Sequence, residues 1–122
     1  MNTETGNWTN FRARFGLLPR DEIDFHYSRR ELGVSYADVM EDVRQTVIVV
    51  LQHAFEQQRP YIMFTHGWST SRRKKTTARS VVREVMRSKL ATPFIDRAGC
   101  IQHESVFVAK IKQRILESRN AG

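Results

Sequence analysis

A run of five mostly apolar residues, YIMFT at positions 61–65, constrains the fold of this chain more than any other feature. It is bounded by Pro60 and Gly67, and it lacks the alternation of apolar and polar residues that marks a strand with one solvent-exposed face. Such a run predicts a strand that is covered on both faces of its sheet. Segments with helical periodicity lie on both sides of it in the sequence, so we expect helices packed on a sheet.

The segment before this strand has the clearest helical pattern. Apolar residues recur at helical spacing from Tyr36 to Ala54, with acidic and amide side chains on the other faces. Ser35 followed by Asp38 approximates a capping box, and Pro60 marks the end because the residue before a proline disfavours helical backbone. The β-branched stretch TVIVVL would suit a strand in isolation, but the surrounding period favours one helix of about six turns.

The remaining segments complete an α/β pattern. The stretch TARSVVREVMRSK predicts a second amphipathic helix with Thr76 or Thr77 as its N-cap. EIDFHY at 22–27 alternates as a strand, and TPFID at 92–96 and SVFVAKI at 105–111 indicate two more. The order β-α-β-α-β-β predicts a single-domain, two-layer α/β sandwich, in which both helices pack on a mixed, mainly parallel four-stranded sheet. The last two strands could form a hairpin or another crossover, and their spacing leaves both open.

The 122 residues divide into three parts, and their number suits one domain. Residues 1–21 are expected to be an N-terminal arm, partly extended or disordered, with aromatic residues that pack on the body. Residues 22–113 are expected to form the α/β domain, and residues 114–122 a tail. Cys100 is the one cysteine, which excludes an internal disulfide and a CxxC metal site and predicts a small buried side chain. The lack of a long apolar run and of a signal-peptide pattern predicts a cytoplasmic protein without a membrane partner.

The positive charge of the chain is concentrated in one stretch. Residues 72–89 contain eight of the 20 basic residues and one of the 13 acidic residues, so they account for the entire net charge of +7. The basic residues are Arg72, Arg73, Lys74, Lys75, Arg79, Arg83, Arg87 and Lys89. A local patch of this kind predicts a polyanion as partner, with nucleic acid as the first candidate.

Histidines are expected at the edge of the sheet next to this patch. If the strands at 22–27 and 61–65 are parallel, His26 and His66 lie at their carboxyl ends, where ligands of open α/β sheets bind. Asp24 would share a strand face with His26. The turn after His66 precedes a helix N-terminus, which suits phosphate, although it does not match the GxxxxGK[ST] nucleotide loop. The scattered histidines define no metal site, and we expect neither a metal nor a cofactor.

Two short motifs resemble those of the Smr (small MutS-related) domain family. Ile23-Asp24-Phe25-His26 stands for the L-D-L-H-G motif, Thr65-His66-Gly67-Trp68 for the H-G-x-G turn, and TARSVVREVMRSK for the helix that follows. The resemblance covers residues 22 to about 112. Tyr27 and Ser69 replace two family glycines, the basic stretch RRKKTT lengthens the turn, and CIQHE replaces a glycine-rich stretch. The resemblance implies a small α/β sandwich that acts on nucleic acid, with DNA-nicking or RNA-cleaving activity in some members. It carries over Asp24, His26 and His66 as catalytic positions.

The leading hypothesis from the sequence is therefore a domain that binds DNA or RNA through phosphates. The expected binding residues are Gly67, Trp68, Ser69, Arg72, Arg73, Lys74, Lys75, Arg79, Arg83 and Arg87. If the domain also cleaves, His66 or His26 would act as general base or acid, with Asp24 orienting an imidazole. The alternative is a non-enzymatic domain that binds an acidic protein through the same patch. The sequence leaves cleavage, specificity and oligomeric state open.

Overall fold

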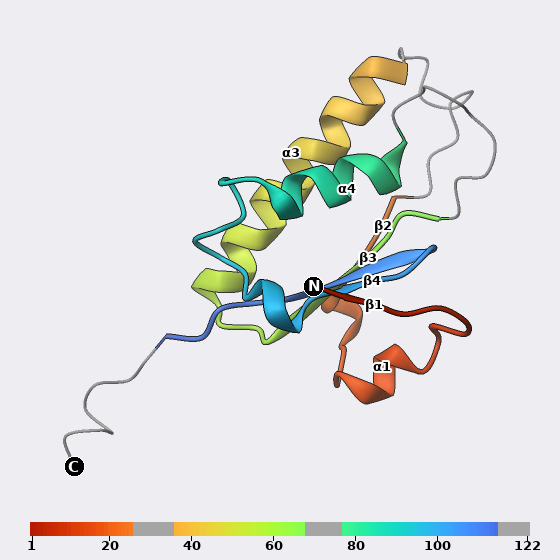
Figure 1. The fold of residues 1–122 in the computed structure, drawn as a ribbon. Coiled ribbons are helices and arrows are strands. Elements are labelled where there is room, and N and C mark those ends of the chain that lie inside the picture. Colours follow the sequence, from red (N-terminus) through yellow and green to blue (C-terminus); the bar gives the residue numbers. More distant parts are fainter. Residues whose placement is uncertain (26–35, 68–76, 115–122) are drawn as a thin grey trace.

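The computed structural model describes residues 1–25, 36–67 and 77–114. Three α-helices and five strands lie within these residues (Figure 1). In chain order the elements are β1 (Asn2–Thr3), α1 (Phe11–Arg14), the 3-10 turn η1 (Pro19–Asp21), β2 (Glu22–Asp24), α3 (Tyr36–Glu56), β3 (Tyr61–Thr65), α4 (Ala78–Arg87), the 3-10 turn η2 (Arg97–Gly99), β4 (Ile101–Gln102) and β5 (Val106–Lys110). Among the described helices, none combines the length and the apolar composition that a membrane span requires.

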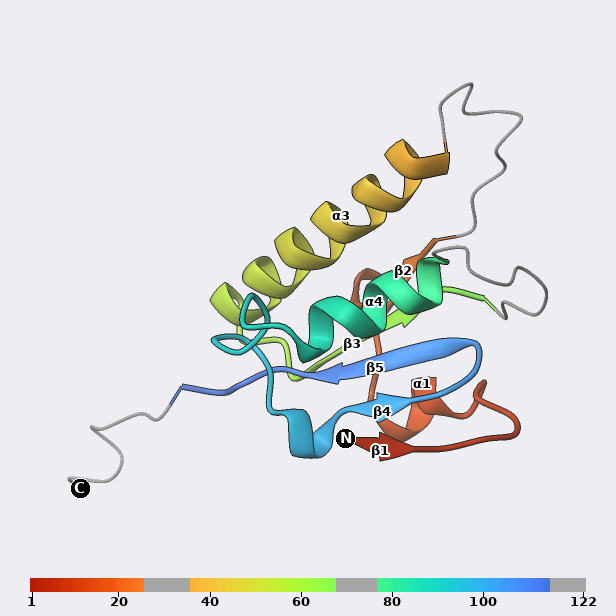
Figure 2. The ribbon, with the colours of Figure 1, turned by 45° about the horizontal axis from the view of Figure 1, so that its top comes forward.

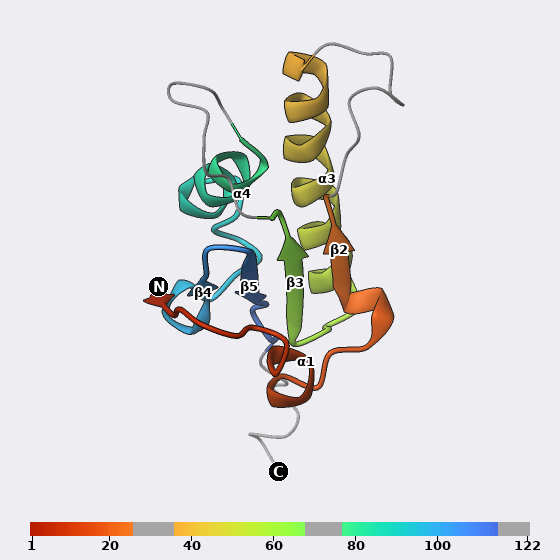
Figure 3. The same ribbon diagram turned by 90° about the vertical axis from the view of Figure 1, so that its right-hand side faces the viewer.

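The strands form one mixed sheet in the order β1-β4-β5-β3-β2. β2 is parallel to β3 and β1 is parallel to β4, whereas β5 is antiparallel to both of its neighbours. The parallel β2–α3–β3 crossover is thus confirmed, and Figure 3 shows β2 and β3 side by side. The last two strands form an antiparallel hairpin. The α/β class is confirmed, but the prediction of a mainly parallel four-stranded sheet is wrong: the sheet has five strands, and β5 is antiparallel to both of its neighbours.

The predicted strand at 92–96 is also wrong. These residues form turns, with backbone bonds from Phe94 and Ile95 back to Ala91, and only an isolated bridge joins Ile95 to Ile111. Ala91 and Ile95 are buried and Phe94 packs against the same core. The apolar residues of this segment therefore pack a turn against the core and do not pair as a strand. The strand that precedes β5 is instead the short β4.

The two faces of the sheet are covered by different parts of the chain (Figure 2). α3 and α4 lie on one face, and α1 lies on the other. Neighbouring residues of β3 divide between the two cores, Phe64 toward α3 and α4 and Met63 toward the N-terminal segment. This division confirms that β3 is buried on both faces.

The N-terminal segment makes the second layer of this packing. Phe11 is buried with Met63, Ile101, Val106 and Val108, while Trp8, Phe15 and Leu17 pack around this group. β1 pairs with β4, which attaches the start of the chain to the sheet edge. The predicted two-layer sandwich is therefore incomplete. The N-terminal segment forms a further layer that buries the apolar side chains on the second face of β3 and β5.

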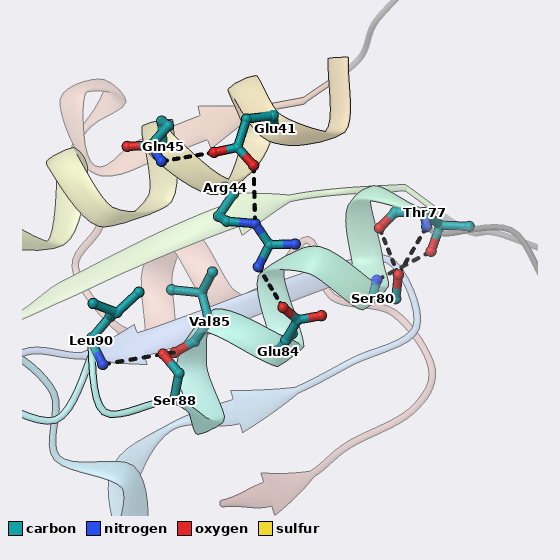
Figure 4. A network of polar contacts seen from close by, with 9 residues as sticks. All are labelled: Glu41, Arg44, Gln45, Thr77, Ser80, Glu84, Val85, Ser88 and Leu90. Atoms are coloured by element: carbon teal, nitrogen blue, oxygen red, sulfur yellow. Dashed lines mark hydrogen bonds and ion pairs between the residues drawn. The ribbon is translucent and has the colours of Figure 1, made fainter. Parts of the chain in front are cut away.

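Helix α4, which carries the basic residues, has a defined beginning and end. The Thr77 side chain accepts a hydrogen bond from the Ser80 N–H, and the Ser80 hydroxyl accepts one from the Thr77 N–H, which confirms Thr77 as the N-cap (Figure 4). Past the other end, the Arg97 guanidinium donates to the carbonyls of Met86 at 2.8 Å and Ser88 at 2.6 Å. Arg97 thereby satisfies helix-end carbonyls and places a cation at the negative end of the dipole.

Candidate nucleic-acid interface

The candidate site lies where β2 and β3 end and α4 begins. In the parallel register, Asp24 lies opposite Thr65, so His66 and Gly67 follow at the same edge. Both backbone N–H groups of His66 and Gly67 donate to the Ser105 carbonyl, at 3.1 and 3.0 Å. Seven of the expected site residues lie outside the described residues: His26, Trp68, Ser69, Arg72, Arg73, Lys74 and Lys75.

Asp24 and His66 lie on opposite faces of the sheet. Ile23 and Phe25 pack into the core beneath α3 and α4, so the side chain of Asp24 points to the other face by strand alternation, where it is exposed. The ring of His66, in contrast, is on the side of α4, where the charges of Arg83 and Arg79 lower its pKa. The structure therefore does not join Asp24 and His66 as an acid–base pair.

His66 is a buried, neutral histidine with a defined tautomer. Only 8% of its surface is exposed, and its Nδ1 lies 2.9 Å from the Gly67 carbonyl oxygen. A carbonyl only accepts, so Nδ1 carries the proton and Nε2 of the neutral ring is left with its lone pair. Burial lowers the pKa of His66 to about 4, and the charges of Arg83 and Arg79 lower it further, while the backbone of Gly67 and of Val106 acts in the opposite direction. His66 Nε2 is buried and makes no hydrogen bond to any described residue.

Gly67 supports this arrangement through its backbone. Its φ of 76° lies in the left-handed region, which glycine adopts without the steric cost of a Cβ. The conformation turns the Gly67 carbonyl back to within reach of the His66 ring. This explains why a glycine follows the histidine at this strand end.

Three arginines of α4, here called the arginine stripe (Arg79, Arg83 and Arg87), lie along residues 102–104. Arg79 donates to the Glu104 carbonyl at 3.5 Å, Arg83 to the His103 carbonyl at 3.2 Å, and Arg87 to the Gln102 side-chain oxygen at 3.2 Å. The four-residue spacing on the helix thus matches successive residues of β4 and the turn after it. These three acceptors are uncharged oxygens, so they orient the guanidinium groups without neutralising them.

The one acid of the basic stretch does not offset the stripe. Glu84 forms an ion pair with Arg44 of α3, on the other flank of α4 (Figure 4). Within the described ranges, neither Arg83 nor Arg87 forms an ion pair with a carboxylate. Burial lowers the pKa of Arg83, and repulsion by Arg79 and Arg87 lowers it further, with Glu104 opposing. Arg83 and Arg87 therefore carry positive charge that no ion pair with a described carboxylate neutralises.

The arginines on the far side of the sheet have a different environment. Arg12 of α1 pairs with Glu22 at 2.9 Å, and Arg14 pairs with Glu4 at 2.8 Å. Arg12 also lies over the ring of Trp8, with 5.3 Å from its Cζ to the ring centroid. Carboxylates thus pair with these two cations, whereas no described carboxylate forms an ion pair with Arg83 or Arg87 on the other face of the sheet.

Residues 102–104 are site neighbours that sequence reasoning missed. They make their contacts mainly through backbone carbonyls, which leave no signature in residue type. His103 itself is structural: its Nε2 donates to the Gly6 carbonyl at 2.7 Å and its Nδ1 accepts from the Ser105 N–H at 3.0 Å. It is buried and holds the N-terminal segment against the hairpin. Cys100 is buried as expected, and burial raises the pKa of its thiol.

The chemistry of the described site is electrostatic. It offers a row of guanidinium groups on α4, a helix N-terminus and one neutral imidazole. No group of three His, Cys, Asp or Glu side chains that could hold a metal ion occurs in the part of the chain that the structure describes. Such a surface suits the phosphates of a polyanion. No family model, curated protein or solved structure matches this chain.

Proposed function

We propose that this protein binds nucleic acid through the phosphate backbone, with the arginine stripe as its main contact. One observation carries the proposal: guanidinium groups of α4 are held by neutral oxygens, while the only acid of that helix is turned toward α3 and Arg44. Like charges four residues apart on a helix repel by a few tenths of a kcal/mol per pair. A row of phosphates would relieve that repulsion.

The geometry of α4 favours contacts with the backbone over reading of bases. Its apolar side, with Val81, Val82, Val85 and Met86, is buried against the sheet. One flank contacts α3 through Glu84, and the other contacts residues 102–104. A helix held on three sides cannot enter a major groove as a recognition helix does. The resemblance to Smr domains points to the same class of ligand.

Binding, rather than cleavage, is the function that we propose. Among the described residues, Asp24 and His66 fall on opposite faces of the sheet and His66 Nε2 is buried. They do not supply the paired acid and base that phosphodiester hydrolysis would use.

The test compares two double variants with the same loss of charge. Arg79→Gln with Arg87→Gln changes the stripe, and Arg12→Gln with Arg14→Gln changes α1 on the opposite face of the sheet (Figure 2). Fluorescence anisotropy would follow labelled single- and double-stranded DNA and RNA of equal length over a salt series. Each lost phosphate contact lowers the slope of log K against log salt by about 0.7–0.9, so the stripe variant should lose about 1.5.

The control variant should keep the slope of the parent, since its arginines are paired with acids on the far face. Equal slopes for the two variants would refute the stripe as the contact surface. Absence of binding by the parent at low salt would refute the function itself. Polyglutamate serves as a competitor, and binding as tight as that of nucleic acid would favour an acidic protein partner instead.

A further inference from the structure

We propose that Arg83 binds one phosphodiester through the two outer N–H groups of its guanidinium. His66 is the positioning residue that holds the guanidinium in the orientation this contact needs. In the complex, the Arg83 Nε–H donates to His66 Nε2, while the His103 carbonyl keeps its bond to Nη2. This inference rests on the proposed function and names a phosphate subsite within it. It also gives His66 a role other than acid or base.

The first argument comes from two buried atoms without partners. His66 Nε2 and Arg83 Nε are both buried and make no hydrogen bond to a described residue. The tautomer set by the Gly67 carbonyl makes His66 Nε2 an acceptor, and Arg83 Nε is always a donor. Arg83 donates to the His103 carbonyl and the His66 N–H donates to the Ser105 carbonyl, so both residues contact the same turn between β4 and β5. Each unpaired buried group destabilises the folded protein, and one hydrogen bond between them would remove both penalties.

Among the described residues, the other two buried polar atoms without a hydrogen bond also belong to a neighbouring acceptor and donor. Asp21 Oδ1 and Arg59 Nε face each other at 3.5 Å as an ion pair between η1 and the start of β3. A carboxylate completes that pair without any ligand. His66 and Arg83 instead combine a neutral acceptor with a cation, so a hydrogen bond between them would leave Arg83 its full charge for an anion.

The second argument comes from the shape of the guanidinium group. Its Nε–H and one Nη2–H lie along the same edge, and Nη2 lies 3.2 Å from the His103 carbonyl oxygen, so a bond from Nε–H to His66 would use the other donor of that edge. Two acceptors on one edge fix the plane of the group. One N–H of each terminal nitrogen then points along the outer edge, which is the fork that binds two phosphate oxygens. Arg83 as a residue is only partly buried, although its Nε is fully buried.

Arg87 provides the contrast within the same stripe. It is exposed, and it donates a hydrogen bond to a flexible side chain, that of Gln102. Among the described residues, no second acceptor fixes the plane of its guanidinium as the His66 and His103 pair would fix that of Arg83. Arg87 should therefore act as a point charge, for which a lysine is an adequate substitute.

The experiment uses charge-conserving variants in the same anisotropy assay. Arg83→Lys keeps the charge but loses the fork and the Nε donor, and we expect affinity for the oligonucleotide to fall about tenfold. Arg87→Lys is the matched control and should change affinity less than about twofold. Equal effects of the two variants would overturn the subsite while leaving the proposed function standing. Failure of the unchanged protein to bind would instead count against the proposed function.

A double-mutant cycle tests the role of His66. His66→Phe removes the acceptor, and His66→Gln retains one. We expect the Phe variant to lose about as much affinity as Arg83→Lys and the Gln variant to lose less. Because His66 acts through Arg83, the Phe substitution should cost nothing further in the Arg83→Lys background. A full additional loss in that background would show a purely structural role and overturn the assignment.

The imidazole itself gives a measurement that needs no variant. Nitrogen-15 NMR of the intact protein near neutral pH should show a proton on His66 Nδ1 and none on Nε2. Addition of the oligonucleotide should shift Nε2 as it accepts the Arg83 proton. A protonated Nε2, or an Nε2 signal that the oligonucleotide leaves unchanged, would overturn the proposal even if the His66 variants do not fold.

Discussion

The buried histidine predicts a specific loss of stability in acid. The pKa of His66 falls from its usual 6.5 to about 4 in the folded protein, chiefly because burial penalises the charged ring. Between these values the unfolded chain binds a proton at this residue and the folded chain does not. Protonation therefore favours unfolding, and the stability contributed by neutral His66 is complete above about pH 6.5 and is lost as the pH falls to about 4.

The magnitude follows from the two pKa values. Each unit of pKa corresponds to about 1.36 kcal/mol, so the whole effect is about 3 kcal/mol. Between about pH 7.5 and about pH 4.5, linkage gives a loss of about 2.5 kcal/mol from this residue alone. Since the ring is 8% exposed, solvent screening reduces this figure little.

The assay is urea denaturation of the parent and of His66→Gln at these two pH values. The variant cannot titrate, so it should lose about 2.5 kcal/mol less stability than the parent on acidification. His53→Gln is the control, because His53 lies exposed on α3, and it should follow the parent. Equal acid sensitivity of His66→Gln and the parent would refute a buried, neutral His66.

Other substitutions test the packing and the electrostatics. Phe11→Ala should destabilise the protein by about 3–5 kcal/mol in denaturant unfolding, whereas Leu18→Ala, which is half exposed, should cost less than about 1 kcal/mol; a small effect of Phe11→Ala would mean that the N-terminal segment is not part of the core. Arg97→Met should cost about 1–3 kcal/mol by removing the bonds to the end of α4, and an unchanged melting temperature would contradict this role. Glu104→Gln should strengthen nucleic-acid binding more than Glu84→Gln, because Glu104 acts on Arg83 while Glu84 faces Arg44; the reverse order of affinities would count against the stripe.

The elements with strong local signals could be predicted from the sequence. Helical period and length predicted α3 despite its β-branched TVIVVL stretch, and the capping residue Thr77 predicted the start of α4. The apolar YIMFT run predicted a strand buried on both faces, which β3 is. Each of these signals depends on residues within a few turns of one another, where periodicity and capping operate directly.

The elements that depend on distant partners could not be predicted. β1 has two residues and exists because it pairs with β4, about a hundred residues later in the chain. The TPFID segment has the composition of a strand, but its apolar residues are used to pack a turn against the core. Short segments of this kind take their conformation from the surface that covers them rather than from their own residues.

The site divides in the same way. The sequence by itself determined that the excess charge is concentrated at residues 72–89, and that three arginines share one helical face. Only the tertiary structure decided that Glu84 turns away to Arg44, that neutral oxygens of residues 102–104 hold the arginines, and that Asp24 and His66 lie on opposite faces. It also decided that His66 is neutral. Charge composition is a property of the chain, whereas desolvation and ion pairing depend on which distant groups the fold brings within a few ångströms.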